Sequence, residues 1–156
     1  MISGTESSAL LLPELTTIQI GEFGKLYISA DRNNWSIVFD YKVAVLIDLD
    51  GELDCGVPST PDQIIYLYFP IYDEDLPNLE RLHAIARFAA DLCKRGESVL
   101  THCKLGLNRS ALLVGVILTY LGLTGEAAVE LLRERRPGAL YNDTFAEYLS
   151  HLPAQQ

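Results

Sequence analysis

Continuous apolar runs separated by polar turns mark the predicted strands of this chain. A run that is apolar throughout and only a few residues long is typical of a β-strand. We expect the first two strands to form the edge of a sheet, and the third and fourth to be buried on both faces. The predicted strands lie near Ile18 to Ile20, Lys25 to Ala30, Val43 to Ile47, Ile64 to Phe69 and Val99 to Thr101.

Apolar residues at helical spacing predict four helices in the second half of the chain. From 79 to 93 they recur every third or fourth position, and Gly96 then ends the helix. Residues 111–121 are apolar nearly all round, which predicts a central helix covered on every side. Capping residues predict two further helices, over 124–136 and from Asn142 or Asp143 to 149.

The length and composition favour a single domain. The chain has 156 residues, 49% of them hydrophobic, so we expect one substantial core. The polar stretch 1–8 is expected to be mobile. No apolar segment is long and uninterrupted enough to predict a membrane span.

One segment, residues 99–110, combines a strand end, a short polar loop and a helix start. Cys103 would lie below the helix N-terminus, where unpaired N–H groups and the helix dipole favour a thiolate and attract phosphate oxygens. Gly106 allows the loop to turn so that its N–H groups converge on one anion. The planar fork of Arg109 can bind two phosphate oxygens at once. The segment therefore predicts a phosphate-binding loop that carries a nucleophile.

Two flanking residues support this interpretation. The Ser110 hydroxyl would donate to the Cys103 sulfur and help the thiolate leave when a covalent intermediate breaks. The His102 side chain would orient the loop through a hydrogen bond with the backbone. The alternatives are a small buried apolar role for Cys103 at a strand end, and a surface position for Arg109 in the first helical turn.

His102-Cys103, Gly106 and Arg109-Ser110 match the signature His-Cys-x-x-Gly-x-x-Arg-Ser/Thr. In these residues the chain resembles the cysteine-dependent protein tyrosine phosphatases, and over about 25–149 it is similar to their small dual-specificity subclass. The resemblance implies an α/β fold over 1–156: one compact three-layer domain with a central, mostly parallel sheet flanked by helices. It also implies that phosphate is bound by Lys104, Leu105, Gly106, Leu107, Asn108 and Arg109.

The resemblance further implies a general acid on a separate loop, after a strand and about thirty residues before the cysteine. Asp73 fits this description best, because it follows the predicted strand 64–69. Asp75 is the first alternative and Glu74 the second. A solvated acidic turn that caps the helix beginning near Asn78 is the structural alternative.

Two features near the C-terminus have both a structural and a functional interpretation. Asn142 follows Arg136-Pro137-Gly138, where the family often has an asparagine or glutamine that positions the loop or the attacking water, and it is equally suited to cap a helix. Arg133, Arg135 and Arg136 would complement the dipole at a helix C-terminus, and steering of phosphorylated substrates is their alternative role.

Charge and cysteine content narrow the function classes. The net charge of −9 argues against a general affinity for nucleic acid or anionic membranes. Cys55, Cys93 and Cys103 lack disulfide spacing, the N-terminus shows no secretory signal, and a reactive thiolate needs a reducing compartment, so we expect a cytoplasmic protein. A protective disulfide between Cys55 and an oxidised Cys103 is the alternative to free thiols. We expect no metal and no cofactor, because the histidines and cysteines lack ligand spacing.

The implied reaction is phosphoester hydrolysis through a cysteinyl phosphate. We expect a phosphorylated protein or peptide as substrate, with phosphotyrosine and also phosphoserine or phosphothreonine. Lys104 in the loop resembles the inositol phospholipid phosphatases, but these commonly have a second basic residue where this chain has Leu107 and Asn108. Asn108 before Arg109 resembles the RNA 5′-triphosphatases, but their polyanionic substrate is a poor match for a chain with net negative charge. A catalytically weak phosphate-binding module is the alternative of another class. The sequence does not indicate the oligomeric state.

Overall fold

A five-stranded sheet forms the centre of the molecule. The computed structural model describes residues 15–30 and 35–155; the predicted mobile stretch 1–8 lies outside them. The strand order is β1-β2-β5-β3-β4, with β1 antiparallel to β2 and every other pair parallel. The strands are β1 (Leu15–Ile18), β2 (Leu26–Ser29), β3 (Val43–Asp48), β4 (Ile65–Tyr68) and β5 (Ser98–His102).

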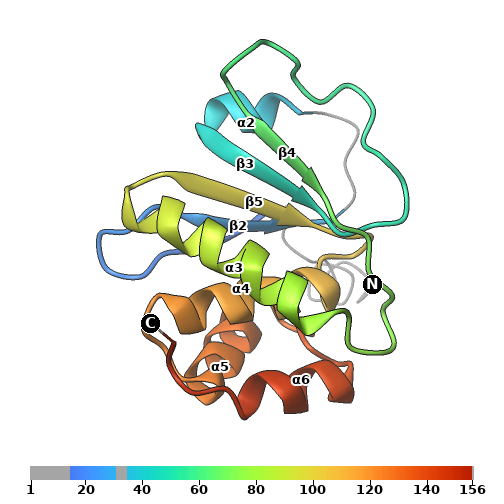
Figure 1. Ribbon diagram of the computed structural model, residues 1–156, viewed down its shortest axis with the longest axis vertical. Helices are drawn as coiled ribbons and strands as arrows, with labels where there is room; N and C mark the ends of the chain where they lie inside the picture. Colours follow the sequence, from blue (N-terminus) through green and yellow to red (C-terminus); the bar gives the residue numbers. More distant parts are fainter. Residues whose placement is uncertain (1–14, 31–34, 156) are drawn as a thin grey trace, which may run out of the picture.

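Helices cover both faces of this sheet, which confirms the predicted three-layer α/β fold (Figure 1). Successive strand residues point to opposite faces, so Leu26 and Ile28 join the core beneath the larger helical layer while Tyr27 joins a smaller core on the other face. Within the described residues no helix has the length and hydropathy of a membrane span. The helices are α2 (Ser36–Asp40), which packs on β3, and α3 (Leu79–Lys94), α4 (Arg109–Tyr120), α5 (Gly125–Arg135) and α6 (Asp143–Ser150) on the opposite side.

The central helix α4 is buried on every side, as its sequence predicts. Every residue from Ser110 to Tyr120 is buried, and the helix contacts α3, α5, α6, β2 and β5. The two helices after it begin at predicted caps: Thr124 accepts a hydrogen bond from the Ala127 N–H, and Asn142 from the Phe145 N–H. Packing on all sides fixes the N-terminus of α4, and with it the loop that follows β5.

Strand burial differs from the prediction at two places. β4 is an edge strand with half-exposed side chains, Ile65 at 48% and Tyr68 at 38% exposure, and is not buried on both faces. β2 lies inside the sheet between β1 and β5, so β1 alone forms that edge. The reason is topological. After β4 the chain returns through helix α3 and inserts β5 between β2 and β3. The apolar content of a strand does not reveal its place in the order of strands. The short helix α2 was not predicted.

A histidine and two tyrosines join three of the helices. His83 Nδ1 lies 2.8 Å from the Tyr120 hydroxyl, and His83 Nε2 lies 2.7 Å from the Tyr148 hydroxyl. A neutral imidazole can accept from one hydroxyl and donate to the other, whereas a protonated ring can only donate. Burial, and then the nearby Arg87, lower the pKa of His83 below its ordinary value. The neutral ring therefore stabilises the contact between α3, α4 and α6.

This pKa shift predicts a loss of stability at mildly acidic pH. Because the pKa of His83 is lower in the folded state, its contribution is complete above the unfolded pKa of about 6.5 and is lost as the pH falls through the folded value. We expect the melting temperature to fall between pH 7.5 and pH 5.5 by roughly 2 °C more in the wild type than in His83→Gln, measured by thermal unfolding. Parallel curves for the two proteins would contradict this assignment.

Candidate active site

The predicted phosphate-binding loop lies at the carboxyl end of the central strand. β5 ends at His102 and α4 begins at Arg109, so residues 103–108 form the connection. The chain crosses the sheet in one direction from β1 to β4 and then reverses, so that β5 lies between the parallel strands β2 and β3. Ligands of open α/β sheets bind outside the carboxyl ends of the strands, which is where this loop lies.

Cys103 lies inside this loop with its sulfur facing a backbone amide. The side chain is 2% exposed, and the Gly106 N–H donates to Cys103 Sγ at 3.2 Å. Gly106 has a φ of 68°, and a Cβ added to it would lie 2.8 Å from the Ser29 carbonyl oxygen. Glycine is therefore required here both by backbone conformation and by space.

Arg109 is held from one end of its guanidinium. Its Nη1 donates to the Ile71 carbonyl at 3.3 Å and lies 3.5 Å from both the Leu49 carbonyl and Asp50 Oδ1. Its Nε is buried and has no hydrogen-bond partner among the described residues. The edge of the guanidinium that carries Nε is therefore the one suited to bind an anion.

One of the three candidate acids reaches this loop. Asn108 Nδ2 donates to Asp73 Oδ2 at 3.3 Å. All three acids are exposed, but Glu74 and Asp75 do not line the cavity above Cys103. That cavity has a volume of about 80 Å³ and is lined by Asp73, Cys103, Lys104, Leu105, Leu107, Asn108, Arg109 and Tyr141.

Asn142 connects the acid loop to the phosphate-binding loop. Its backbone N–H donates to Asn108 Oδ1 at 3.0 Å, and its Nδ2 donates to the Asp73 carbonyl at 3.0 Å. Its Oδ1 accepts from the Phe145 N–H and so caps α6. The helix-cap and loop-contacting alternatives are thus both realised by one side chain. The sequence offers no sign that the buried Asn108 bridges Asp73 and Asn142.

The two flanking residues behave differently from the expectation. His102 Nε2 lies 2.6 Å from Asp54 Oδ2, and its Nδ1 has no partner in the described part of the chain. The predicted hydrogen bond from the ring to the backbone is therefore wrong within the described residues, because Nε2 pairs with the Asp54 carboxylate and Nδ1 faces no acceptor or donor. Ser110 is fully buried, and its hydroxyl likewise has no hydrogen-bond partner within residues 15–30 and 35–155.

Arg136 is the site residue that the sequence did not single out. It is fully buried, so the steering role considered for it is wrong, although it does lie at the C-terminal cap of α5 as expected. Nε donates to the Gly106 carbonyl at 2.7 Å, and Nη2 donates to the Leu105 carbonyl at 2.9 Å. Burial lowers the pKa of Arg136, and the Cys103 sulfur partly opposes this change. Nothing in the pattern distinguishes it from Arg133, which binds the Ala139 and Leu140 carbonyls.

The other cysteines lie away from the cavity lining. Cys93 is buried on α3, as expected, and burial raises the pKa of its thiol to about 12. Cys55 is exposed, and all three cysteines are free thiols. The Cys93 thiol, with so high a pKa, is unreactive near neutral pH.

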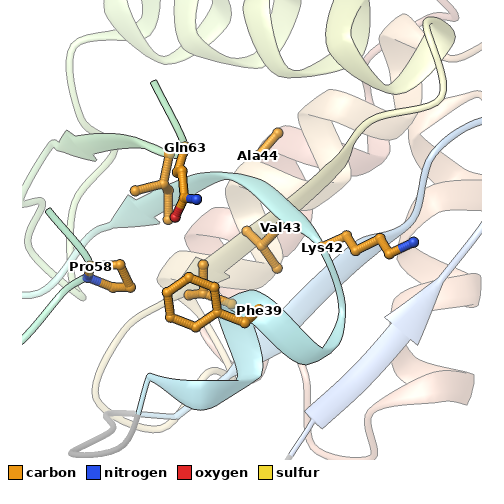
Figure 2. A pocket seen from close by; sticks show the side chains of 8 residues that line it. Phe39, Lys42, Val43, Ala44, Pro58 and Gln63 are labelled. Atoms are coloured by element: carbon orange, nitrogen blue, oxygen red, sulfur yellow. The ribbon is translucent and has the colours of Figure 1, made fainter. Parts of the chain in front are cut away.

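A second hollow lies at the opposite end of the sheet. It has a volume of about 310 Å³ and is next to the first residues of β3, whereas the phosphate-binding loop follows the last residue of the parallel strand β5. Figure 2 shows Phe39, Pro58 and Gln63 around it. Its lining contains no cysteine, hydroxyl, histidine or carboxylate side chain: Val38, Phe39, Lys42, Val43, Ala44, Pro58, Gln63 and Ile64.

Comparisons with known proteins find phosphatases that are similar to this chain in sequence and in fold. "Dual specificity protein phosphatase 1" of Arabidopsis thaliana is 28% identical over 128 residues, which cover 79% of this chain and 62% of the relative. The "PRL-1 phosphatase" of Drosophila melanogaster is 50% identical over 42 residues, covering 27% of this chain and 24% of that protein. The chain thus spans less than two thirds of the length of these relatives.

Solved structures share the fold. Human DUSP28 superposes with a TM-score of 0.74 at 19% identity, over 89% of this chain and 92% of that one. Tk-PTP in its active form superposes with a TM-score of 0.68 at 25% identity, over 92% of this chain and 99% of that one. The sequence model described as "Dual specificity phosphatase, catalytic domain" matches residues 37–154. With most of its length matched by that model, the chain belongs to the dual specificity phosphatase family.

Proposed function

We propose that this protein hydrolyses phosphorylated proteins or peptides, with Cys103 as the nucleophile. The observation that carries the proposal is the buried Cys103 sulfur, which accepts the Gly106 N–H at 3.2 Å in a cavity shared with Arg109 and Asp73. A thiolate needs such donors to form and to be aligned. The same donors can bind the oxygens of a phosphoryl group.

In the first step the Cys103 thiolate attacks phosphorus opposite the leaving oxygen. The S–P bond forms as the P–O bond to the substrate breaks, and Asp73 gives its proton to the departing oxygen. Arg109 and the loop N–H groups stabilise the charge on the three remaining phosphoryl oxygens. The products are a cysteinyl phosphate, a free alcohol or phenol, and an ionised Asp73.

In the second step water releases the phosphate. Asp73, now a carboxylate, takes a proton from the attacking water, the O–P bond forms, and the S–P bond breaks. The Ser110 hydroxyl, which has no other partner among the described residues, donates to the leaving sulfur. Inorganic phosphate leaves and the Cys103 thiolate is restored. These steps require no oxidant or reductant.

A phosphoprotein substrate suits the rim of the cavity. Leu105 and Tyr141, at 52% and 60% exposure, offer apolar surface beside the phosphate-binding loop. This surface favours the aromatic ring of phosphotyrosine. Because a chain of 156 residues has few loops to wall a deep cleft, phosphoserine and phosphothreonine are expected as substrates too. Lys104 is the one lysine in the cavity lining, which is less positive charge than an inositol phospholipid headgroup favours. The thiolate chemistry favours the reducing cytoplasm as the compartment.

We expect Cys103→Ser to abolish turnover while retaining tungstate binding, because the loop amides and Arg109 remain. The measurement is phosphate release without added metal from phosphotyrosine and phosphothreonine peptides, a phosphoinositide and a 5′-triphosphorylated RNA. Cys55→Ser, which changes an exposed thiol, is the matched control and should keep full activity. Faster phosphate release from the phosphoinositide or the RNA would contradict the phosphoprotein substrate and assign the protein to another activity of the same superfamily. Tungstate binding with no release from any substrate would favour a phosphate-binding module.

The acid assignment predicts different effects for two neighbouring carboxylates. Asp73→Asn should lower kcat by roughly a hundredfold, because the leaving oxygen then departs without a proton. Asp75→Asn, an equal change of charge in the same loop, should have little effect. Steady-state kinetics with a phosphotyrosine peptide tests both variants. Equal effects of the two substitutions would remove Asp73 from the mechanism.

Arg136 is expected to set the orientation of two peptide groups in the loop. Because its guanidinium binds the Leu105 and Gly106 carbonyls, the N–H groups of those peptide units face the opposite way, toward Cys103. Arg136→Lys keeps the charge but cannot bind both carbonyls in a fixed geometry.

We therefore expect Arg136→Lys to weaken tungstate binding by about tenfold, the loss equivalent to one hydrogen bond to a charged group. Arg135→Lys, at an exposed position on the same helix, is the control. The measurement is competitive inhibition by tungstate, with thermal unfolding to verify that both variants are folded. An inhibition constant unchanged in the folded Arg136→Lys protein would show that the carbonyl contacts do not set the loop.

A further inference from the structure

Two aspartates, a tyrosine and a histidine form a hydrogen-bonded cluster behind the phosphate-binding loop. His102 Nε2 pairs with Asp54 Oδ2 at 2.6 Å, the Tyr66 hydroxyl donates to Asp48 Oδ2 at 2.5 Å, and the Asp54 N–H donates to the Tyr66 oxygen at 2.9 Å. Asp48 and His102 are fully buried, and the Asp54 side chain is 6% exposed. Asp48, Asp54 and Tyr66 have no part in the steps described above.

The cluster is suited to hydrogen bonding more than to metal binding. Ligand atoms of Asp48, Asp54 and His102 lie within 4.8 Å of one another. However, His102 Nε2 already shares a proton with Asp54, and Asp48 already accepts the Tyr66 hydroxyl and the Asp50 N–H. A metal ion would have to break these hydrogen bonds in a nearly closed space. The carboxylates are satisfied by protein donors as they stand.

Burial makes this cluster costly unless its members hold one another in place. An unpaired carboxylate in a protein interior is strongly unfavourable, whereas a fully hydrogen-bonded network is rigid. Burial, and then the hydrogen bond with Asp48, raise the pKa of Tyr66 well above its ordinary value, so the hydroxyl remains a donor near neutral pH. Trp35 closes the cluster: its ring lies 5.5 Å from that of His102, and its Nε1 donates to the Cys55 carbonyl.

The cluster touches both sides of the phosphate-binding loop. On one side, His102 is the residue before Cys103, and its carbonyl accepts the Leu49 N–H at 3.0 Å. On the other side, Asp48 Oδ1 accepts the Asp50 N–H at 2.9 Å, and Asp50 Oδ1 lies 3.5 Å from Arg109 Nη1. Asp48 and His102 are also paired across β3 and β5. A single network therefore borders the candidate nucleophile and the candidate phosphate-binding arginine.

We propose that Asp48, Asp54 and Tyr66 are positioning residues, which act through His102 on Cys103 and through Asp50 on Arg109. This inference rests on the proposed function of the same site. Loss of one member is expected to slow the chemical step more than it weakens substrate binding, because small displacements of reacting groups are costly in rate.

The first test is Asp54→Asn, which is nearly isosteric but replaces an acceptor oxygen by an amide. We expect kcat to fall by roughly tenfold with a much smaller change in KM. Glu52→Gln is the matched control, since Glu52 is an exposed carboxylate in the same loop, and it should leave both constants unchanged. A folded Asp54→Asn protein with wild-type kcat would overturn the proposal.

The second test is Tyr66→Phe, which removes one hydroxyl and keeps the ring. It should lower kcat in the same direction as Asp54→Asn, while Tyr68→Phe, at an exposed position on the same strand, should not. Proton NMR with ¹⁵N-labelled histidine supplies a direct readout, because the chain has three histidines. A downfield Nε2–H resonance of His102, paired with Asp54, should be present in the wild type and in both controls and lost in Asp54→Asn. Its absence from the wild type would contradict the network.

Alkylation of Cys103 separates this proposal from the proposed function, since it needs no turnover. In a Cys55→Ser background, iodoacetamide should modify Cys103 roughly tenfold more slowly in Asp54→Asn than in the wild type, as measured by mass spectrometry. If the wild type hydrolyses no phosphoester but this difference is found, the function is wrong and the positioning network stands. If hydrolysis is found and the alkylation rates are equal, the network is wrong and the function stands.

Discussion

A loop whose N–H groups converge on one point must send its carbonyl groups elsewhere, and this constraint governs the architecture around Cys103. The loop between β5 and α4 lies against the protein interior, where unpaired carbonyl oxygens are unfavourable. The buried guanidinium of Arg136 takes two of them, from Leu105 and Gly106. A guanidinium suits this task because its planar set of donors binds neighbouring acceptors in fixed directions. An anion-binding surface on one side of the loop thus depends on a buried cation on the other.

Support for the loop comes from parts of the chain that are far apart in sequence. The segment after α5 supplies Arg136 and Asn142, which contact the loop and the Asp73 segment from the helical side. The ends of β3 and β5 supply Asp48 and His102, which lie behind it in the sheet. Rigid elements on both sides leave the loop little freedom to rearrange.

The local pattern of apolar and polar residues predicted most of the helices and strands. It failed for the burial of β4 and the edge position of β2, which depend on the order of strands in the sheet. Periodicity and caps found α3 to α6, because an amphipathic or fully apolar helix leaves a repeating signal. The exposure of β4 follows from its place at the edge of the sheet, and that place is set by the return of β5 to the centre. The five-residue α2 is too short to carry a periodic signal.

The candidate site shows the same division between local and long-range information. Cys103, Gly106 and Arg109 are recognisable because their spacing is local. The role of Arg136 depends on a fold that brings it to Gly106 across 30 positions of the sequence, and the partner of His102 is Asp54, which is 48 positions away. No pattern within a short window encodes such a contact.

Asn142 uses one side chain both to cap α6 and to hold the Asp73 segment. The folding of this helix end and the placement of the candidate acid are consequently one cooperative event. If the first turn of α6 frays, Asn142 releases the carbonyl of Asp73 at the same time, although the core and the loop around Cys103 remain intact. The Asp73 side chain then keeps its contact with Asn108, so the local stability of one helix terminus bears on how firmly the backbone of the candidate acid is held.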